Sequence, residues 1–276
     1  MINLLFGGNY KVFDGILLCL MSICKNTKEI INVFILTADV REIKPEYKPI
    51  QKEQVKFLTE YIQNFNKNNK VTLITLGKDF NEWILKSSNK LNTYTPFAFL
   101  RLFADSIKEL PEKIIYLDTD IMVAGDIKEL FDVNIDNYEI AAVKDNLGKW
   151  FIAPKYFNSG VLLMNLKTIK QTHLLHKVKQ LCQTKKMAFP DQTALNKLAT
   201  KVLYLPRKFN EQHKLKNDTI IQHFCKRIKW LPIIKTQNIK PWQIKEVQNV
   251  YKIHAYDDIY KEFLNIKLNA QKEKHA

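Results

Sequence analysis

Short apolar runs alternate along this chain with longer stretches that carry apolar residues at helical spacing. The runs that we expect to be buried strands are residues 2–6, 32–36, 71–76 and 113–117. The stretches that we expect to be helices are residues 12–25, 49–66 and 97–110, the last of them stopped by Pro111. This alternation predicts an α/β fold: a Rossmann-like, mostly parallel sheet flanked by helices.

The alternation covers most of the chain and is lost near its end. A chain of 276 residues, 46% of them hydrophobic, is long enough for one large α/β domain. After residue 225 the sequence becomes basic and aromatic without a clear strand and helix pattern. We therefore expect a main domain over residues 1–225 and a small basic C-terminal extension over residues 226–276, packed on or near the core.

The formal net charge of +15 favours polyanionic partners such as anionic lipid, nucleic acid or phosphorylated substrates. From Lys201 onward 16 Lys or Arg residues face 7 Asp or Glu residues. Lysines interleaved with tryptophans favour a peripheral contact of the extension with an anionic membrane. The alternative is that these tryptophans close the end of the core. Nucleic acid is a poor candidate because no recognised binding module is found.

The cysteines and the longest apolar run bear on the compartment. Residues 16–24 form an apolar run that is far shorter than the roughly 20 residues needed to cross a bilayer. No basic segment precedes it, as a secretory signal would require, so we expect a cytoplasmic protein. Cys19, Cys24, Cys182 and Cys225 lack paired spacing, which disfavours zinc and favours reduced, buried thiols.

Two carboxylates follow the expected strand at residues 113–117. Asp118 and Asp120 are two residues apart, so in extended chain their side chains point the same way. Two negative charges at the rim of an apolar strand need compensation, and hard oxygen ligands suit Mg²⁺ or Mn²⁺. A turn cap or pairing with surface lysines is the alternative. His223 follows another apolar pair and is a third ligand candidate, although a lone histidine is often structural.

Four sequence blocks, in order along the chain, resemble those of the family 8 glycosyltransferases. The blocks are YLDTDI at residues 116–121 with GDI at 125–127, FNSGVLLMN at 157–165, PDQTALN at 190–196, and HF with KW between residues 223 and 230. The resemblance implies a GT-A type fold and a nucleotide-sugar-binding catalytic domain over residues 1–225. It also implies that Asp118, Asp120 and His223 hold Mn²⁺ or Mg²⁺.

The same resemblance assigns residues to the UDP-sugar donor. The matching positions are Gly7, Gly8, Asn9 and Tyr10 in the nucleotide loop, Arg101, Asp118 and Thr119 near the phosphates, Asn158 at the sugar, and Lys229 at the diphosphate. Gly7 stands where the family often has an acidic residue that helps to read the base, so uracil recognition rests on fewer matches. Lys226 replaces a usual glycine and Lys229 lacks its usual following proline; Lys240, followed by a proline and a tryptophan, is the alternative diphosphate lysine.

The family retains the anomeric configuration of the transferred sugar. Gln192 matches the position closest to the reacting face, Asp191 grips sugar hydroxyls, and Asp145 resembles an aspartate near the acceptor. The expected function is transfer of glucose or galactose from UDP-glucose or UDP-galactose to a saccharide or lipid-linked glycan, in cell-surface polysaccharide or lipooligosaccharide synthesis. This places the enzyme in the cytoplasm, peripheral at the inner face of the cell membrane. A sugar nucleotidyltransferase and a non-catalytic basic binding protein are the competing interpretations.

Overall fold

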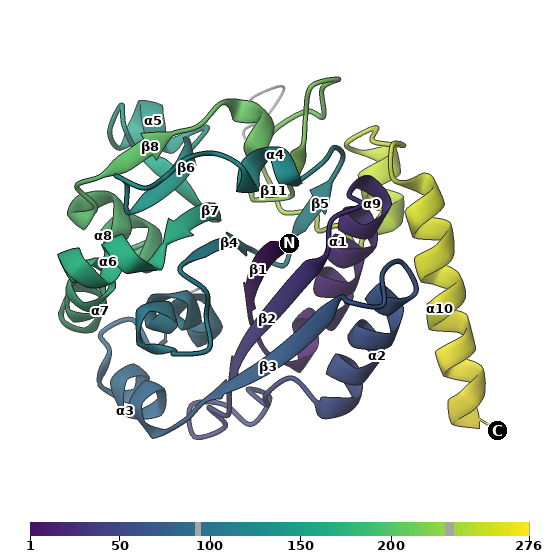
Figure 1. The fold of residues 1–276 in the computed structure, drawn as a ribbon, viewed down its shortest axis with the longest axis horizontal. Coiled ribbons are helices and arrows are strands. Elements are labelled where there is room, and N and C mark those ends of the chain that lie inside the picture. The colour runs from purple at the N-terminus through teal and green to yellow at the C-terminus, as the bar shows by residue number, and fades with distance from the viewer. Residues whose placement is uncertain (92–94, 230–234, 276) are drawn as a thin grey trace.

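The computed structural model describes residues 1–91, 95–229 and 235–275 (Figure 1). The strands are β1 (Ile2–Gly7), β2 (Ile31–Ala38), β3 (Lys70–Leu76), β4 (Lys113–Leu117), β5 (Ile121–Val123), β6 (Ile140–Lys144), β7 (Phe157–Asn165), β8 (Val202–Tyr204), β9 (Ile221–His223), β10 (Arg227–Lys229) and β11 (Lys235–Gln237). The α-helices are α1 (Phe13–Asn26), α2 (Lys52–Gln63), α3 (Lys78–Lys86), α4 (Lys128–Phe131), α5 (Gly148–Phe151), α6 (Leu166–Thr172), α7 (Leu174–Thr184), α8 (Pro190–Leu198), α9 (Ile244–Asn249) and α10 (Asp257–His275). The 3₁₀ helices are η1 (Tyr10–Val12), η2 (Pro96–Ser106) and η3 (Arg207–Phe209).

A seven-stranded sheet in the order β3-β2-β1-β4-β7-β6-β8 forms the centre of the molecule. β1 is parallel to β2 and β4, β2 is parallel to β3, and β6 is parallel to β8. β7 runs antiparallel to both of its neighbours, β4 and β6. The predicted α/β fold with a mostly parallel sheet is therefore confirmed, and β7 is the exception to the parallel direction.

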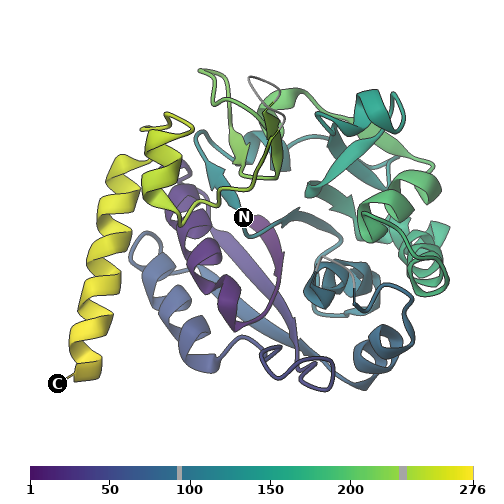
Figure 2. The ribbon, with the colours of Figure 1, turned by 180° about the vertical axis from the view of Figure 1, so that it is seen from behind.

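Helices cover both faces of the sheet. Successive side chains of a strand point to opposite faces, so an apolar strand must be buried on both sides. In β1, Leu4 and Phe6 join the core cluster under α1 and α2, while Leu5 joins the cluster on the opposite face. That second cluster is formed with η2, α3, α6, α7 and α8. Figures 1 and 2 show the two groups of helices on either side of the sheet.

The segment expected to be an α-helix over residues 97–110 is instead the 3₁₀ helix η2, which ends at Ser106. Three residues per turn place Phe97, Leu100 and Phe103 along one line, and all three are buried in the core under the sheet. Arg101 lies between them and is also buried. Phe99 and Leu102, which lie on other lines of the helix, are buried as well, so η2 is enclosed on nearly all sides.

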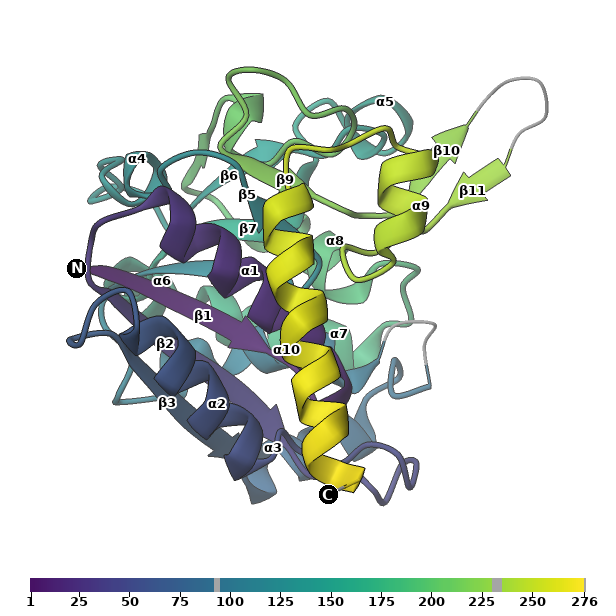
Figure 3. The ribbon, with the colours of Figure 1, turned by 90° about the vertical axis from the view of Figure 1, so that its right-hand side faces the viewer.

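The C-terminal helix α10 packs along α1 and α2 (Figure 3). Its residues Tyr260 and Phe263 are buried in the same cluster as α1. The Tyr61 hydroxyl donates to Glu262 at 2.9 Å, and Lys267 pairs with Asp14 at 2.8 Å. The division of the chain at residue 225 stays a prediction. No helix among the described residues is long and apolar enough to span a membrane, and all four cysteines are free thiols.

Candidate functional site

The two polar loops picked out in the sequence lie at one edge of the sheet. β1 and β4 are neighbouring parallel strands, so Gly8-Asn9 and Asp118-Thr119-Asp120 follow them on the same side. The Asp118 backbone N–H donates to Gly160 O at 2.8 Å, which fixes the start of the acidic loop against β7. Strand β5 then pairs antiparallel with β9 and aligns Ile121 with His223. This pairing brings the histidine, about a hundred residues away in sequence, to the two carboxylates.

Asp118, Asp120 and His223 form a compact group of ligand atoms, all within 4.8 Å of one another. His223 Nε2 lies 3.2 Å from Asp120 Oδ1 and 3.9 Å from Asp118 Oδ2. The imidazole is buried, while the two carboxylates remain partly open. The backbone of Gly160 lies directly beneath: a Cβ there would come within 2.3 Å of His223 Cε1 and 2.8 Å of Asp118 Oδ2. The cluster therefore requires glycine at this position.

A chain of amide hydrogen bonds orients the histidine. The Gly160 N–H donates to Asn158 Oδ1 at 3.0 Å, and the Asn210 amide nitrogen donates to the same oxygen at 3.0 Å. Asn210 therefore turns its own carbonyl oxygen to His223 Nδ1, 3.2 Å away. Since that oxygen can only accept, Nδ1 carries the proton and Nε2 presents its lone pair to the carboxylate side. Asn210 is fully buried and was missed in the sequence.

The donor set fits a divalent cation. Two carboxylates and one neutral imidazole are ligands that Mn²⁺ and Mg²⁺ accept, with coordination positions left for phosphate oxygens. Asp118 Oδ1 already accepts from the Tyr116 hydroxyl at 2.7 Å, which leaves Oδ2 facing His223. The second oxygen of Asp120 is instead contacted by a lysine.

Lys240 supplies that contact. Its Nζ lies 2.6 Å from Asp120 Oδ2 and donates to Phe224 O at 3.3 Å. Burial alone would raise the pKa of Asp120, but its contacts with His223 and Lys240 outweigh burial and hold the pKa below its ordinary value. Lys229, the preferred lysine in the sequence, has its backbone in β10, and its side chain lies outside the described part of the structure. The prediction for Lys229 thus stays a prediction.

Arg101 reaches the acidic loop from η2. Its Nη2 lies 3.0 Å from Asp191 Oδ2 and 3.3 Å from Asp118 Oδ1, and its Nη1 donates to Ser159 O at 2.6 Å. The guanidinium also lies over the Tyr116 ring, 4.2 Å from its centroid. Burial raises the pKa of Asp191, although Arg101 partly offsets this. Arg101 therefore ties the first carboxylate to the start of α8, where Asp191 and Gln192 lie.

Asp145, Asn158 and Gln192 form a second polar group beside the first. Asp145 Oδ2 accepts from the Asn158 amide at 3.0 Å and from the Gln192 amide at 3.3 Å. The Gln192 carbonyl oxygen accepts from the Ser159 backbone N–H at 3.0 Å. The structure thus brings together three residues that sequence comparison assigned to the donor sugar and the acceptor.

The expected nucleotide loop is tightly built. A Cβ at Gly8 would come within 2.3 Å of the Val12 side chain, so the turn into η1 needs glycine there. Asn9 is buried and its side chain accepts from the Lys11 N–H at 3.2 Å, which is a structural capping contact. Tyr10 is half-buried at the loop surface. The backbone oxygen of Thr119 would lie 2.2 Å from a Cβ on Gly15, so the acidic loop rests directly on α1.

Comparison with known proteins identifies the family to which the chain belongs. The model of the family "Glycosyl transferase family 8" matches residues 2–246. Glycosyltransferase GlyB of Streptococcus pneumoniae is 32% identical over 182 residues, which are 59% of this chain and 43% of that protein. Lipopolysaccharide 1,2-glucosyltransferase of Escherichia coli K12 is 27% identical over 260 residues, 87% of this chain and 72% of that protein. The chain thus spans less than half of the length of GlyB.

A solved structure agrees in fold. The galactosyltransferase LgtC, crystallised with donor and acceptor sugar analogs, matches with a TM-score of 0.68 and 16% identity, over 95% of each chain. At this identity the likeness concerns the fold, which is the GT-A architecture predicted from the sequence. Because the family model covers most of the chain, including the acidic loop and His223, this protein is a member of glycosyltransferase family 8.

Proposed function

We propose that this chain is a metal-dependent, retaining hexosyltransferase that moves glucose or galactose from a UDP-sugar to a saccharide or lipid-linked glycan. The observation that carries the proposal is the group formed by Asp118, Asp120 and His223. Its position beyond β4, next to the loop that follows β1, is where ligands bind in open α/β sheets. Relatives named as a glucosyltransferase and a galactosyltransferase support the choice of hexose.

The metal group would hold Mn²⁺ or Mg²⁺ against the donor diphosphate. When bound, the cation neutralises the charge that develops on UDP as it leaves. Arg101 and Lys240 add two protein cations at the same loop, at Asp118 and Asp120 respectively. Charge-assisted contacts hold both beside the loop before the donor arrives, and Lys240 would leave Asp120 for the diphosphate when the donor binds. We assign Lys240 to the diphosphate, with Lys229 as the alternative from the sequence.

The chemistry of Gln192 bears on the route by which the anomeric configuration would be retained. Its carbonyl oxygen is engaged by the Ser159 N–H and its nitrogen by Asp145, and an amide is a poor nucleophile. We therefore propose a front-face substitution without a covalent enzyme intermediate. The bond from the anomeric carbon to the phosphate oxygen breaks, and the acceptor oxygen bonds to the same face. The acceptor proton passes to the leaving phosphate, and the Gln192 carbonyl dipole stabilises the cationic sugar centre.

The remaining residues bind the two substrates. Gly7, Gly8, Asn9 and Tyr10 would form the uracil loop, with the half-exposed Tyr10 ring available for stacking. Thr119 would lie beside the phosphates. The Asn158 amide would donate a hydrogen bond to a sugar hydroxyl, Asp191 would accept one, and Asp145 would face the acceptor. Synthesis of a glycan destined for the cell surface would place the enzyme in the cytoplasm, at the inner face of the membrane.

A donor panel tests this proposal. The purified chain is incubated with Mn²⁺ and UDP-glucose, UDP-galactose or UDP-N-acetylglucosamine, and free UDP is measured. We expect slow hydrolysis of one hexose donor, loss of that activity in Asp120→Asn, and retention in Asp126→Asn. Asp126 is a matched control because it caps the following turn at Lys128 and is not one of the three clustered ligands. UDP release that is equally fast in Asp120→Asn, or without any divalent cation, would contradict the assignment.

Membership of the family argues against the two competing interpretations. A sugar nucleotidyltransferase would release no UDP from a UDP-sugar, and would convert it to UTP and a sugar phosphate only when diphosphate is added. A non-catalytic basic protein would release no UDP from any donor, and would bind DNA with strong salt dependence. UDP release in the donor panel therefore favours the glycosyltransferase over both alternatives, and UTP formation with added diphosphate or salt-dependent DNA binding separates those two.

A further inference from the structure

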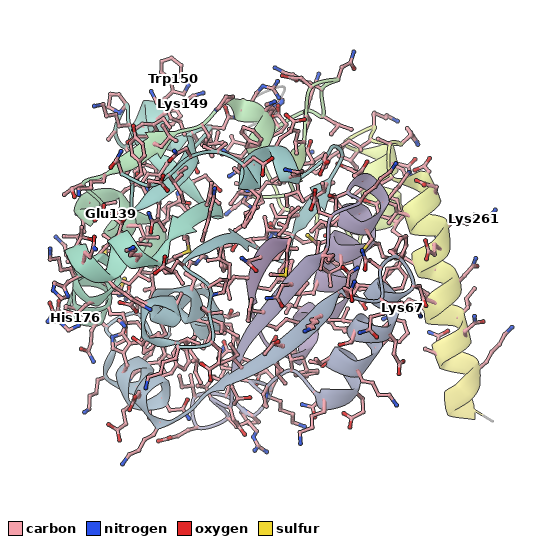
Figure 4. All side chains as sticks on the ribbon, viewed as in Figure 1. Lys67, Glu139, Lys149, Trp150, His176 and Lys261 are labelled. Atoms are coloured by element: carbon pink, nitrogen blue, oxygen red, sulfur yellow. The ribbon has the colours of Figure 1, made fainter. Side chains whose placement is uncertain are left out.

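The short helix α5 and Ile152, which follows it, expose three consecutive large apolar side chains. Trp150 is 77% exposed, Phe151 68% and Ile152 52%, and together they are here called the α5 ledge. Trp150 is the most exposed of the large apolar side chains described. Figure 4 shows it projecting from α5 at the edge of the molecule, next to Lys149. Exposed apolar residues are normally scattered singly, so a contiguous group with an aromatic tip indicates an interaction surface.

Lysines surround the α5 ledge. Lys149 lies over the Trp150 ring, 5.8 Å from its centroid. Lys155 and Lys197 line a cavity of about 510 Å³ that also includes Ile152. None of these three lysines forms an ion pair with a described residue. Eight other lysines, spread over the described part of the chain, do form ion pairs. The surface next to the ledge is therefore positively charged and available to anions.

The α5 ledge is directly connected to the proposed acceptor side of the site. The backbone N–H groups of Leu147 and Gly148 donate to Asp145 Oδ1 at 3.0 and 2.7 Å. The other oxygen of Asp145 contacts Asn158 and Gln192. A partner that binds the ledge is thus held beside the segment that carries Asp145, the residue expected to face the acceptor.

We propose that the α5 ledge and its three lysines form a contact with an anionic bilayer surface. Tryptophan with neighbouring aliphatic side chains is favoured at the boundary between acyl chains and head groups, and lysines meet the lipid phosphates. The contact would present a lipid-linked acceptor to Asp145. This choice of acceptor rests on the proposed function, whereas the contact itself rests on the exposure and charge of α5.

The C-terminal helix is the competing membrane contact. It exposes Leu264 (48%) and Leu268 (54%), one turn apart and without an aromatic residue. Figure 1 shows α10 beyond α1 and α2, at the opposite end of the long axis from α5. The two surfaces can therefore be separated by substitution.

Vesicle co-sedimentation tests the proposal with the whole chain. Vesicles of phosphatidylglycerol and phosphatidylcholine are compared with vesicles of phosphatidylcholine alone. We expect binding to the anionic vesicles, weakened about tenfold or more by Trp150→Ser with Ile152→Ser, since partial burial of these two large apolar side chains together contributes at least that factor. Leu264→Ser with Leu268→Ser removes two exposed leucines from α10 and should leave binding unchanged. Replacing Lys149, Lys155 and Lys197 by Ala should abolish the preference for phosphatidylglycerol.

Three results would overturn the proposal. The first is a native chain that does not sediment with anionic vesicles, and the second is a loss of vesicle binding confined to the α10 variant. The third is a native chain that is dimeric in solution while Trp150→Ser is monomeric, because the α5 ledge would then contact a second copy of the chain. UDP release from the donor is measured in parallel without vesicles, and we expect the same rate for the native chain and the α5 variant. Donor hydrolysis without vesicle binding would refute the membrane contact alone. Vesicle binding without donor hydrolysis would refute the proposed function alone.

Discussion

A methyl group at residue 160 is expected to disable the metal group while the sheet stays folded. In Gly160→Ala the new Cβ would lie 2.3 Å from His223 Cε1 and 2.8 Å from Asp118 Oδ2. The glycines have no positive φ, so alanine is allowed by the backbone and the effect comes from contact alone. Ordinary contact begins near 3.4 Å, and the imidazole must therefore move by about 1 Å.

The size of the effect follows from that displacement. Metal–ligand distances tolerate about 0.2 Å, so a shift of about 1 Å removes His223 from any geometry shared with Asp118. We expect the affinity for Mn²⁺ to fall about 100-fold, the upper end of what disturbing the surroundings of a metal ligand costs. That factor equals about 2.8 kcal/mol of binding free energy. Crowding in the buried strand should lower the free energy of unfolding by about 1–3 kcal/mol.

Titration calorimetry with Mn²⁺ and thermal unfolding measure the two quantities separately. Gly125→Ala is the matched control: its Cβ would approach the Ile220 side chain at 3.2 Å, outside the metal group. The control should bind Mn²⁺ as tightly as the native chain. Native Mn²⁺ affinity in folded Gly160→Ala would show that Asp118 and His223 do not share a cation.

Three further predictions concern residues around this group. Asn210→Ala should lower Mn²⁺ affinity about 10- to 100-fold by freeing the orientation of His223, as calorimetry would detect; unchanged affinity would refute the role of the amide chain. Gln192→Ala should lower kcat for transfer by about 100-fold or more while Mn²⁺ affinity is unchanged, and near-normal turnover would sink the assignment. Lys240→Ala removes a cation that competes for Asp120 Oδ2, so Mn²⁺ alone should bind as well or better, whereas UDP with Mn²⁺ should bind about tenfold more weakly. Weaker UDP binding in Lys229→Ala instead would return the diphosphate role to Lys229.

The fold was largely predictable because strand burial is written locally in the sequence. The runs in β1, β2 and β4 are largely apolar and buried, and each is followed by a helix or a polar loop. The run at residues 71–76 does form the strand β3, but the expectation that it is buried was wrong, because β3 lies at the edge of the sheet and none of its residues is buried. In the structure, the parallel pairing of β1 and β4 places the loops that follow these two strands at one edge of the sheet. The direction of β7 was not predictable, because a buried apolar run reads the same in either direction.

The sequence singled out Asp118, Asp120 and His223, which the structure brings together, but it did not indicate the contacts that join them. The pairing of β5 with β9 joins segments about a hundred residues apart, and no local pattern specifies it. Asn210 was missed because a single asparagine after an apolar residue is common, and its value lies in reaching both His223 and Asn158. Lys240 was only the alternative to Lys229 in the sequence. In the structure β10 pairs with β11, and the chain after β11 brings Lys240 to Asp120.

The location of the cation tests the account most directly. Crystals of the chain grown with Mn²⁺ and UDP would give anomalous diffraction at the manganese edge. We predict one peak coordinated by Asp118, Asp120 and His223, with Lys240 moved from Asp120 toward the diphosphate. A manganese peak elsewhere, or UDP bound with no metal at these three residues, would contradict the proposed mechanism.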